Sequence, residues 1–256
     1  MPHTLFISDL HLSADQPHSL AEFRQFTDEI APHAEALYIL GDLFEYWAGD
    51  DHLDDPFHAE VAAALACLAH HRTQVYLLRG NRDLLMGSAL ADACHATLLD
   101  DPTPIDLYGV PTLLTHGDTL CTDDIEYQRY RAMVHDEAFQ RRFLAQPLSE
   151  RKDYIAGLRA RSMAEKKIKD AAIMDVNAEA VEALLREFNY PRLIHGHTHR
   201  PARHEHLVDG HQCERWVLGD WHEQGSALRV DATGCNVILF KPGSSGGPAL
   251  PHTGLF

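Results

Sequence analysis

Five short polar clusters hold the side chains that could do chemistry in this 256-residue chain. Each cluster directly follows an apolar, β-prone run: TLFI, LYIL, VYLL, PTLLT or RLI. Together they supply seven candidate metal-binding residues, namely Asp9, His11, Asp42, Asn81, His116, His197 and His199. One metal ion needs three or four protein ligands when water completes its shell, so seven side chains suit two ions that share a bridging carboxylate.

The types of donor indicate which metal and which reaction to expect. The set contains carboxylate, amide and imidazole groups but no sulfur, which favours Mn²⁺, with Fe²⁺ or Zn²⁺ as alternatives and Mg²⁺ disfavoured by the imidazoles. A pair of such ions lowers the pKa of bound water toward neutrality and suits in-line attack on a phosphorus ester. Arg82 follows Asn81 directly and could hold a non-bridging phosphate oxygen in the transition state.

Other polar and aromatic residues near these clusters are interpreted more plainly. His195 precedes two candidate ligands, and we interpret it as positioning the loop, with metal binding as the alternative. Asp118 and Asp123 either orient ligands or solvate a loop. Trp47 and Trp221 are expected to pack in the interior. The remaining histidines of this region are expected at the surface or beside the ligands: His204, His206, His211 and His222.

Helical patterns separate the early apolar runs. Ser19 and Glu22 form a capping box, which predicts a helix start at Ser19. Residues 57–70 have high helix propensity, and Asn177 is a plausible N-cap for a helix with apolar residues at i, i+3, i+4 and i+7. Alternating strands and helices predict an α/β sheet, in which the loops after the strands converge on one crevice.

One segment interrupts this regular spacing. Successive early clusters lie 31 to 39 residues apart, but 81 residues separate His116 from His197. The surplus coincides with a basic stretch, because residues 129–169 hold eleven Lys and Arg against five Asp and Glu. We predict that residues 120–175 form a helical insertion beside the active face. Its apolar side chains either line a groove for acyl chains or simply pack on the core.

Composition excludes several classes of function. The net charge of −16 argues against general nucleic-acid binding, which requires an excess of Lys and Arg. The sequence has no signal-peptide pattern and no run of about 18 apolar residues. Five scattered cysteines without a CxxC pair are typical of a reducing, cytoplasmic protein. The GSSGG stretch at 243–247 predicts a flexible tail at 243–256.

The blocks DLH, GDLFE, GNRD, THGD and GHTH, in this order, resemble the calcineurin-like metallophosphoesterases. That resemblance implies an α/β fold, a two-layer β-sandwich flanked by helices, over residues 1–242, with 120–175 as a helical lid insertion. Longer blocks, ILGDLFEYW, LTHGDTLCTDD, AIMDVN and LIHGHTHRPARHE, resemble the lipid A branch of that superfamily, the UDP-2,3-diacylglucosamine diphosphatases. This closer resemblance covers roughly residues 4–225.

The resemblance also implies roles for individual residues. Asp9, His11, Asp42 and His199 would hold one Mn²⁺, and Asp42, Asn81, His116 and His197 would hold the other. Asp42 and Arg82 would be catalytic. Family substrate contacts would fall on Asn81, Arg82, Asp124, Ser162, Lys166, Lys169 and His197. The reaction would release UMP and 2,3-diacylglucosamine 1-phosphate (lipid X). A broader phosphoesterase acting on nucleotides or phosphoproteins is the alternative, and a binding module with degraded metal sites is disfavoured because all seven positions are filled.

Two positions depart from the family patterns. The superfamily usually has a His, a candidate general acid, where this chain has Arg82; the departure is expected in the lipid A branch, because UMP leaves readily without protonation. Lys166 stands where Asn is common, which makes that contact less certain. The expected partners are a UDP-linked diacyl sugar lipid and an anionic inner-membrane surface, with the protein cytoplasmic and peripheral in a Gram-negative bacterium. A monomer is expected.

Overall fold

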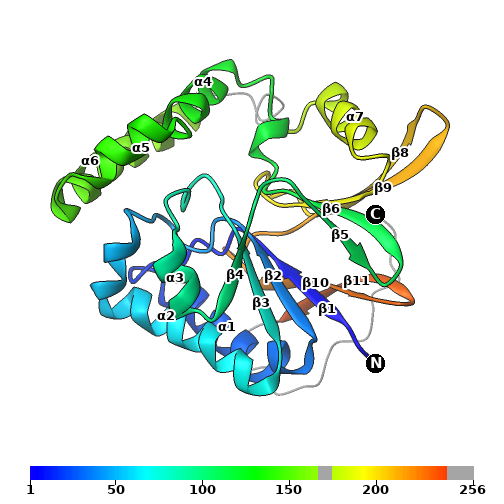
Figure 1. Cartoon of the computed structure of the whole chain (residues 1–256), viewed down its shortest axis with the longest axis horizontal. Helices are drawn as coiled ribbons and strands as arrows, with labels where there is room; N and C mark the ends of the chain where they lie inside the picture. Colours follow the sequence, from blue (N-terminus) through cyan, green and yellow to red (C-terminus); the bar gives the residue numbers. More distant parts are fainter. Residues whose placement is uncertain (167–174, 241–256) are drawn as a thin grey trace.

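Two β-sheets packed face to face form the body of the protein (Figure 1). The computed structural model describes residues 1–166 and 175–240, with the backbone alone for residues 161–166. The six-stranded sheet has the order β11-β10-β1-β2-β3-β4, and the five-stranded sheet has the order β5-β6-β7-β9-β8. This confirms the α/β sandwich expected from the sequence.

The strands are β1 (Thr4–Ile7), β2 (Ala36–Leu40), β3 (Gln74–Leu78), β4 (Ala96–Leu99), β5 (Thr103–Leu107), β6 (Val110–Leu114), β7 (Arg192–His195), β8 (Ala202–Val208), β9 (His211–Val217), β10 (Gly225–Asp231) and β11 (Gly234–Phe240). The α-helices are α1 (Pro17–Gln25), α2 (Pro56–Cys67), α3 (Ser88–Ala93), α4 (Ile125–Val134), α5 (Glu137–Leu144), α6 (Leu148–Lys166) and α7 (Ala178–Glu187).

Three apolar clusters hold the layers together. Between the sheets, Phe6, Leu40 and Leu78 meet Leu114 and Ile194. Helices α1, α2 and α3 cover the outer face of the six-stranded sheet, and α7 covers the other sheet. Trp47 and Trp221 belong to the α1–α3 cluster with exposed fractions of 1% and 0%, as expected of packing residues. The runs TLFI and VYLL are apolar at nearly every position because both faces of their strands are covered.

The direction of the strands brings the polar clusters to one end of the sandwich. Strands β1, β2, β3 and β4 are parallel neighbours, and so are β6 and β7 in the second sheet. Parallel strands finish at the same edge of a sheet, so the loops after β1, β2 and β3 meet there. The loops after β6 and β7 meet them from the second sheet.

The helix starts show one wrong prediction and one confirmed one. Helix α1 begins at Pro17, two residues before the predicted capping box, because proline suits the first turn of a helix. Ser19 lies inside α1, where its hydroxyl donates to the carbonyl of Trp221 at 3.4 Å. Asn177 does cap α7, since its side chain accepts the backbone N–H of Ala180 at 3.1 Å.

Strand β8 is a second departure from the sequence-based expectations. Its sequence, ARHEHLV, has no apolar alternation, so the sequence alone does not predict a strand there. It pairs along its whole length with β9, from Ala202 opposite Val217 to Val208 opposite His211. Charged and histidine side chains are common on an edge strand, because they discourage pairing with another chain. The β-prone runs RWVLGDW, SALRVD and NVILF, which follow His199 in the sequence, correspond to β9, β10 and β11.

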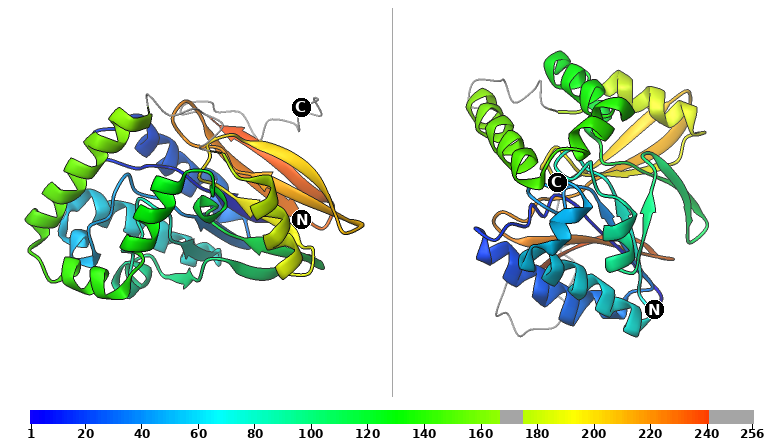
Figure 2. Two further views of the ribbon diagram at one scale, coloured as in Figure 1. Left: turned by 90° about the horizontal axis from the view of Figure 1, so that it is seen from above. Right: turned by 60° about the vertical axis from the view of Figure 1, so that its left-hand side comes forward.

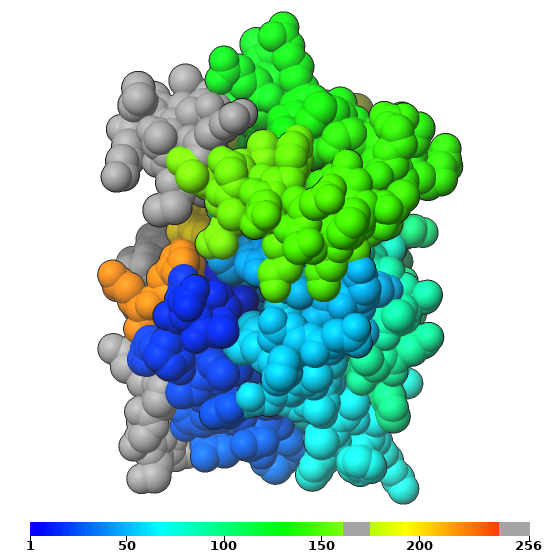
Figure 3. Space-filling model, turned by 90° about the vertical axis from the view of Figure 1, so that its left-hand side faces the viewer, coloured from blue at the N-terminus to red at the C-terminus, as the bar shows by residue number. Residues whose placement is uncertain are grey.

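Helices α4, α5 and α6 lie over the end of the sandwich that carries the polar clusters, and we refer to these three helices as the lid (Figure 2, Figure 3). Arg151 of α6 is 3% exposed and binds the buried carbonyl of Ala48 and the carboxylate of the exposed Asp51. Gly49, with φ of 125°, leaves room for it, because a Cβ there would strike the Arg151 guanidinium and Leu144. Helix α6 is therefore tied to the loop that follows β2.

Two further expectations concern the C-terminal tail and membrane-spanning helices. The predicted tail at 243–256 lies outside the described residues. Across residues 1–166 and 175–240, no helix has the length and apolar character needed to cross a membrane.

His52 and His58 form a buried pair whose ring centroids are 3.9 Å apart. Burial lowers the pKa of each ring from 6.5 to about 4. Between pH 6.5 and 4 the unfolded chain therefore binds more protons than the folded chain does. The stability that the neutral pair contributes is thus complete above pH 6.5 and is lost as the pH falls through this range. When the pH falls from 7.5 to 5.0, we expect the free energy of unfolding to decrease less in His52→Phe than in the wild type. Urea denaturation at each pH measures this decrease.

The exposed His71 provides the matched control for that experiment. His71→Phe should keep the pH dependence of the wild type. Parallel stability curves for wild type and His52→Phe would show that the pair does not titrate in this way.

Candidate active site

All seven candidate ligands lie together at the shared end of the two sheets. They follow five strands: Asp9 and His11 after β1, Asp42 after β2, Asn81 after β3, His116 after β6, and His197 and His199 after β7. Both aspartates and His116 are almost completely buried, at 0%, 2% and 0% exposure. The sheet interface therefore assembles one site from residues that are up to 190 positions apart in the sequence.

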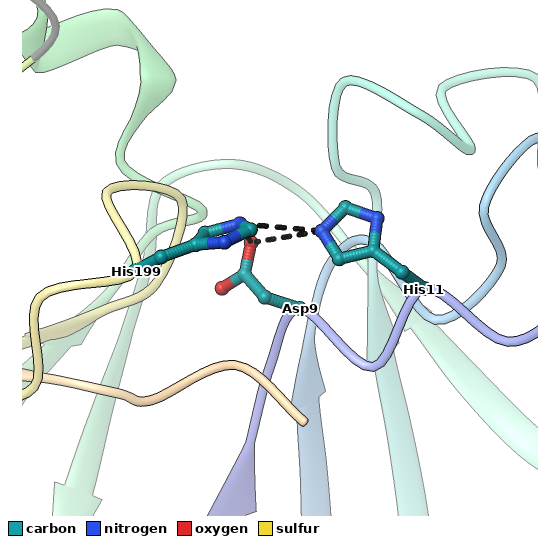
Figure 4. A group of neighbouring side chains, drawn as sticks. All are labelled: Asp9, His11 and His199. Atoms are coloured by element: carbon teal, nitrogen blue, oxygen red, sulfur yellow. Dashed lines mark hydrogen bonds and ion pairs between the residues drawn. The ribbon is translucent and has the colours of Figure 1, made fainter. Parts of the chain in front are cut away.

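One group consists of Asp9, His11 and His199, whose side chains point toward one another in Figure 4. His199 Nε2 lies 3.2 Å from His11 Nε2 and 3.3 Å from Asp9 Oδ1. Asp42 Oδ2 is 3.8 Å from His11 Nε2. Asp9 Oδ1 is buried and accepts no hydrogen bond within the described part of the chain. Lone-pair atoms that face one another in this way suit a cation between them.

A second group lies on the other side of Asp42. Asp42 Oδ1 is 3.7 Å from His116 Nε2, which is itself 3.1 Å from Asn81 Oδ1. His197 Nδ1 approaches the same amide oxygen at 2.9 Å. The two oxygens of Asp42 therefore face different groups, which is the arrangement that a shared carboxylate requires.

The electrostatics of this site also call for positive charge. Although burial alone would lower it, the carboxylates of Asp42 and Asp9 raise the pKa of His116 to about 9. Burial and then the nearby His116 lower the pKa of His197 to about 3. The two buried carboxylates thus favour a proton on the His116 ring, which partly neutralises them. A bound divalent cation would supply this positive charge instead. Oxygen and nitrogen donors, close contacts and charge all fit a divalent metal cofactor.

The backbone is strained at five of these seven residues. Asp9, His11, Asp42, His197 and His199 have φ values of 56°, 50°, 53°, 69° and 55°. The left-handed region costs an L-residue about 1–2 kcal/mol, and such strain persists where the surrounding structure holds it, commonly at functional sites. None of the five is a glycine, although Asp and His adopt this conformation more often than most other residues do.

Gly196 illustrates how closely the backbone approaches the carboxylates. A Cβ at this position would collide with Ser8 Oγ and Asp9 Oδ2. Those two atoms form a 2.6 Å hydrogen bond, and Asp9 Oδ2 also accepts the backbone N–H of His197 at 2.9 Å. The loop after β7 is therefore held directly on the Asp9 carboxylate.

We expect Gly196→Ala to lower the free energy of unfolding by about 1–3 kcal/mol, because the added methyl group overpacks a buried hydrogen-bonded site. Displacement of Asp9 should also weaken metal binding. Urea denaturation and Mn²⁺ titration measure the two effects. Gly157→Ala is the control, since a Cβ there meets nothing within 4 Å and alanine favours the helix. Equal stability of the two variants would contradict the close approach.

Three carboxylates that support the site were not identified from the sequence. Asp83 is fully buried and accepts the backbone N–H groups of Leu43 at 2.7 Å and Gly80 at 2.8 Å, which ties the loops after β2 and β3 together. Asp220 Oδ2 is 2.9 Å from His199 Nδ1, and Glu45 Oε2 is 3.0 Å from His11 Nδ1. All three stand in loops that follow strands, in the blocks GNRD, GDW and GDLFE, which is the signal that could have found them.

His195, which the sequence left between two interpretations, has both ring nitrogens occupied. Nδ1 donates to the carbonyl of Gly196 at 2.9 Å, and Nε2 accepts from Arg215 at 3.1 Å. This geometry agrees with a loop-positioning role. His222 is exposed but stacks on His11, with ring centroids 5.6 Å apart.

Asp118 and Asp123 hold the lid to the core. The carboxylate of Asp118 is buried and accepts from the hydroxyl of Tyr127 at 2.8 Å and from Arg131 Nε at 2.7 Å, both on α4. Asp123 accepts from the Asn177 side chain at 3.0 Å. Of the two interpretations left open, neither describes Asp118 well, because it positions a helix.

The predicted substrate contacts are only partly within the described residues. Asn81, Arg82, Asp124 and His197 line one pocket of about 750 Å³ beneath the lid. The Asp124 side chain also caps α4 by accepting the N–H of Tyr127 at 3.1 Å. The side chains of Ser162 and Lys166, and the whole of Lys169, lie outside the described residues.

Comparisons with known proteins show the family to which this chain belongs. Residues 2–201 match the family model of the calcineurin-like phosphoesterases. The chain is 54% identical to the UDP-2,3-diacylglucosamine hydrolase of Aromatoleum aromaticum, over 92% of this chain and 96% of the relative. It is 50% identical to the protein of that name from Edwardsiella ictaluri (92% and 91% covered) and 47% identical to that from Serratia proteamaculans (93% and 99%). The chain therefore belongs to the calcineurin-like phosphoesterases and, among them, to the family of the UDP-2,3-diacylglucosamine hydrolases.

Proposed function

We propose that this protein hydrolyses the diphosphate of UDP-2,3-diacylglucosamine, yielding UMP and 2,3-diacylglucosamine 1-phosphate in lipid A biosynthesis. One observation carries the proposal: a single pocket joins the candidate metal groups to an apolar chamber formed by the lid. Its lining includes the candidate ligands His11, Asp42 and Asn81. It also includes apolar side chains of the three lid helices, Val134, Phe139, Phe143, Ile155 and Leu158.

The chamber has the character that acyl chains need. Each buried methylene contributes about 0.8 kcal/mol to lipid binding, so even a few methylenes in the chamber add substantially to affinity. A phosphoesterase restricted to nucleotides would gain nothing from it. This argues for the lipid substrate over the broader nucleotide or phosphoprotein activity.

Two Mn²⁺ ions are the cofactor that we propose. Asp9, His11, Asp42 and His199 would hold one, and Asp42, Asn81, His116 and His197 would hold the other. When bound, such a pair would lower the pKa of water and offset the negative charge that develops at phosphorus. Mn²⁺ is proposed over Fe²⁺ or Zn²⁺ because the donors are carboxylate, amide and imidazole without sulfur.

The chain's own side chains would hold the diphosphate in place. The Arg82 side chain is 20% exposed, lies on the pocket wall and can donate to a non-bridging phosphate oxygen. Its backbone N–H donates to Asp42 Oδ1 at 2.8 Å, so the backbone of Arg82 is fixed against the shared carboxylate. Because UMP departs as a weakly basic phosphate, the reaction needs no protonated histidine at position 82.

The direct test is hydrolysis of UDP-2,3-diacylglucosamine in ¹⁸O-labelled water with Mn²⁺. We expect UMP release, with the label in the phosphate of one product only, which also identifies the phosphorus that is attacked. Treatment with EDTA should abolish the activity, and added Mn²⁺ should restore it more fully than Zn²⁺. If no UMP forms while nucleotide esters are cleaved efficiently, the broader phosphoesterase is the correct assignment.

We also propose that the lid rests on the anionic inner-membrane surface. Apolar side chains on α4 are exposed to solvent, with Ile125 at 60% and Met133 at 42%, and the exposed basic residue Arg129 lies between them on the same helix. This combination is typical of a surface that lies on lipid headgroups. The membrane would also supply the substrate.

We expect Met133→Glu to weaken binding to phosphatidylglycerol vesicles about tenfold, because a charge replaces about 1.5 kcal/mol of apolar contact. Vesicle flotation measures this. Val237→Glu on β11, which is also exposed, should bind vesicles as the wild type does. Equal binding by wild type and Met133→Glu would exclude α4 from the contact.

A further inference from the structure

Glu45 lies between the lid and the first candidate metal group. It stands in the loop after β2, and its backbone N–H donates to the carbonyl of Leu12 at 3.0 Å, which fixes this loop against the loop after β1. Its carboxylate is 14% exposed and faces two ways. Oε2 lies 3.0 Å from His11 Nδ1, and Oε1 lies 2.5 Å from Arg159 Nη2.

The contact with His11 sets the direction of that ring. Glu45 Oε2 and His11 Nδ1 approach as an ion pair, and Nδ1 has no hydrogen-bond partner among the described residues. A carboxylate this close favours the proton on Nδ1, which leaves the Nε2 lone pair free to bind a metal. His11 Nε2 is the atom that faces His199 Nε2 and the Asp42 carboxylate. Glu45 therefore determines whether His11 presents a ligand atom to this group.

The contact with Arg159 belongs to the lid. Arg159 is on α6, and its guanidinium carbon lies 5.6 Å from the centre of the Tyr46 ring. Its Nε is buried without a hydrogen-bond partner in the described part of the chain. The remaining charged neighbour of Glu45 Oε1, Arg82 Nη1, is farther away at 3.9 Å. Arg159 is thus the cation that holds Glu45 in position, and it does so only while α6 is seated on the core.

We propose that Glu45 is a positioning residue that couples the seating of lid helix α6 to metal binding at His11, an inference that rests on the metal site of the proposed function. With α6 in place, Arg159 holds the Glu45 carboxylate against His11. When α6 lifts, Glu45 loses this partner, and the ring of His11 loses its orientation. Coupling is reciprocal, so bound metal must also stabilise the seated lid.

The test measures Mn²⁺ affinity by the EPR signal of free Mn²⁺, which requires no substrate. Glu45→Gln keeps the shape but removes the charge, and it should weaken binding roughly 10- to 100-fold, the usual effect of losing a partner of a metal-ligating histidine. Arg159→Met should weaken binding about fivefold or more. Arg159→Lys keeps the cation and should restore most of the affinity.

A double variant separates coupling from general damage. If Arg159 acts through Glu45, Glu45→Gln with Arg159→Met should bind Mn²⁺ no more weakly than Glu45→Gln alone. Arg141→Met, which removes an exposed arginine of α5 paired with Glu137, is the matched control and should not change the affinity. In wild type, Mn²⁺ should also slow amide hydrogen exchange in α6, and Glu45→Gln should abolish that effect.

The outcomes distinguish this inference from the proposed function. Unchanged Mn²⁺ affinity in Arg159→Met, or additive losses in the double variant, would overturn the coupling while leaving the hydrolase assignment intact. If the single and double variants show the expected Mn²⁺ affinities but the wild type releases no UMP, the coupling is supported and the proposed substrate is overturned. A wild-type protein that binds no Mn²⁺ would overturn both the coupling and the proposed metal.

Discussion

Replacement of Asp42 by Asn is expected to lower the rate of UMP release about 10³-fold and to reduce the Mn²⁺ bound per chain by at least half. The size follows from the loss of preorganised charge at a buried site, where one such group is worth about 10²–10³ in rate. Asp42 is the side chain whose two oxygens face both groups, toward His11 and His116. An amide offers one oxygen and turns an N–H₂ toward the other group.

The backbone contact makes this substitution informative. Asn can still accept the N–H of Arg82 through its remaining oxygen, so the loop should stay in place. Metal content by mass spectrometry of metals and UMP release by chromatography measure the two effects. Asp28→Asn, at an exposed position on the far helix layer, should match the wild type. An Asp42→Asn protein that keeps both ions and full activity would refute the shared carboxylate.

The second large effect is expected in the lid chamber. Leu158→Asp should lower kcat/KM for UDP-2,3-diacylglucosamine at least 100-fold, because a charge in an apolar chamber opposes the burial of acyl chains. Leu158 lies on α6 and lines the pocket. Hydrolysis of a small phosphodiester such as bis-p-nitrophenyl phosphate should change little, since that substrate does not reach the chamber.

Ala156 on the same helix gives the control, because it is exposed and does not line the pocket. Ala156→Asp introduces the same charge and should leave both activities unchanged. Equal losses on the lipid and on the small diester in Leu158→Asp would mean that the lid shapes the metal groups generally. An unchanged kcat/KM for the lipid would show that the acyl chains bind elsewhere.

Much of the candidate site could be predicted from the sequence because each ligand is recognised by the residues next to it in the chain. Each ligand stands directly after a short β-prone run, so Asp9 and Asp42 are identified by their position next to TLFI and LYIL. Parallel strands then place such residues at one edge of a sheet. The same local reasoning found Asn177 as a helix cap. It failed at Ser19, where the packing of α1 and the proline at its first turn set the helix start instead.

The amino-acid sequence by itself determined the chemistry available to this protein: oxygen and nitrogen ligands after five strands, and a basic, apolar insertion. Only the tertiary structure decided how these parts act together. It divided the ligands between two sheets, held five of them in left-handed backbone, and placed Glu45 between Arg159 and His11. Propensity and spacing act over a few residues, whereas the contacts of Glu45 join it to residues 34 and 114 positions away and exist only once the two sheets and the lid have packed.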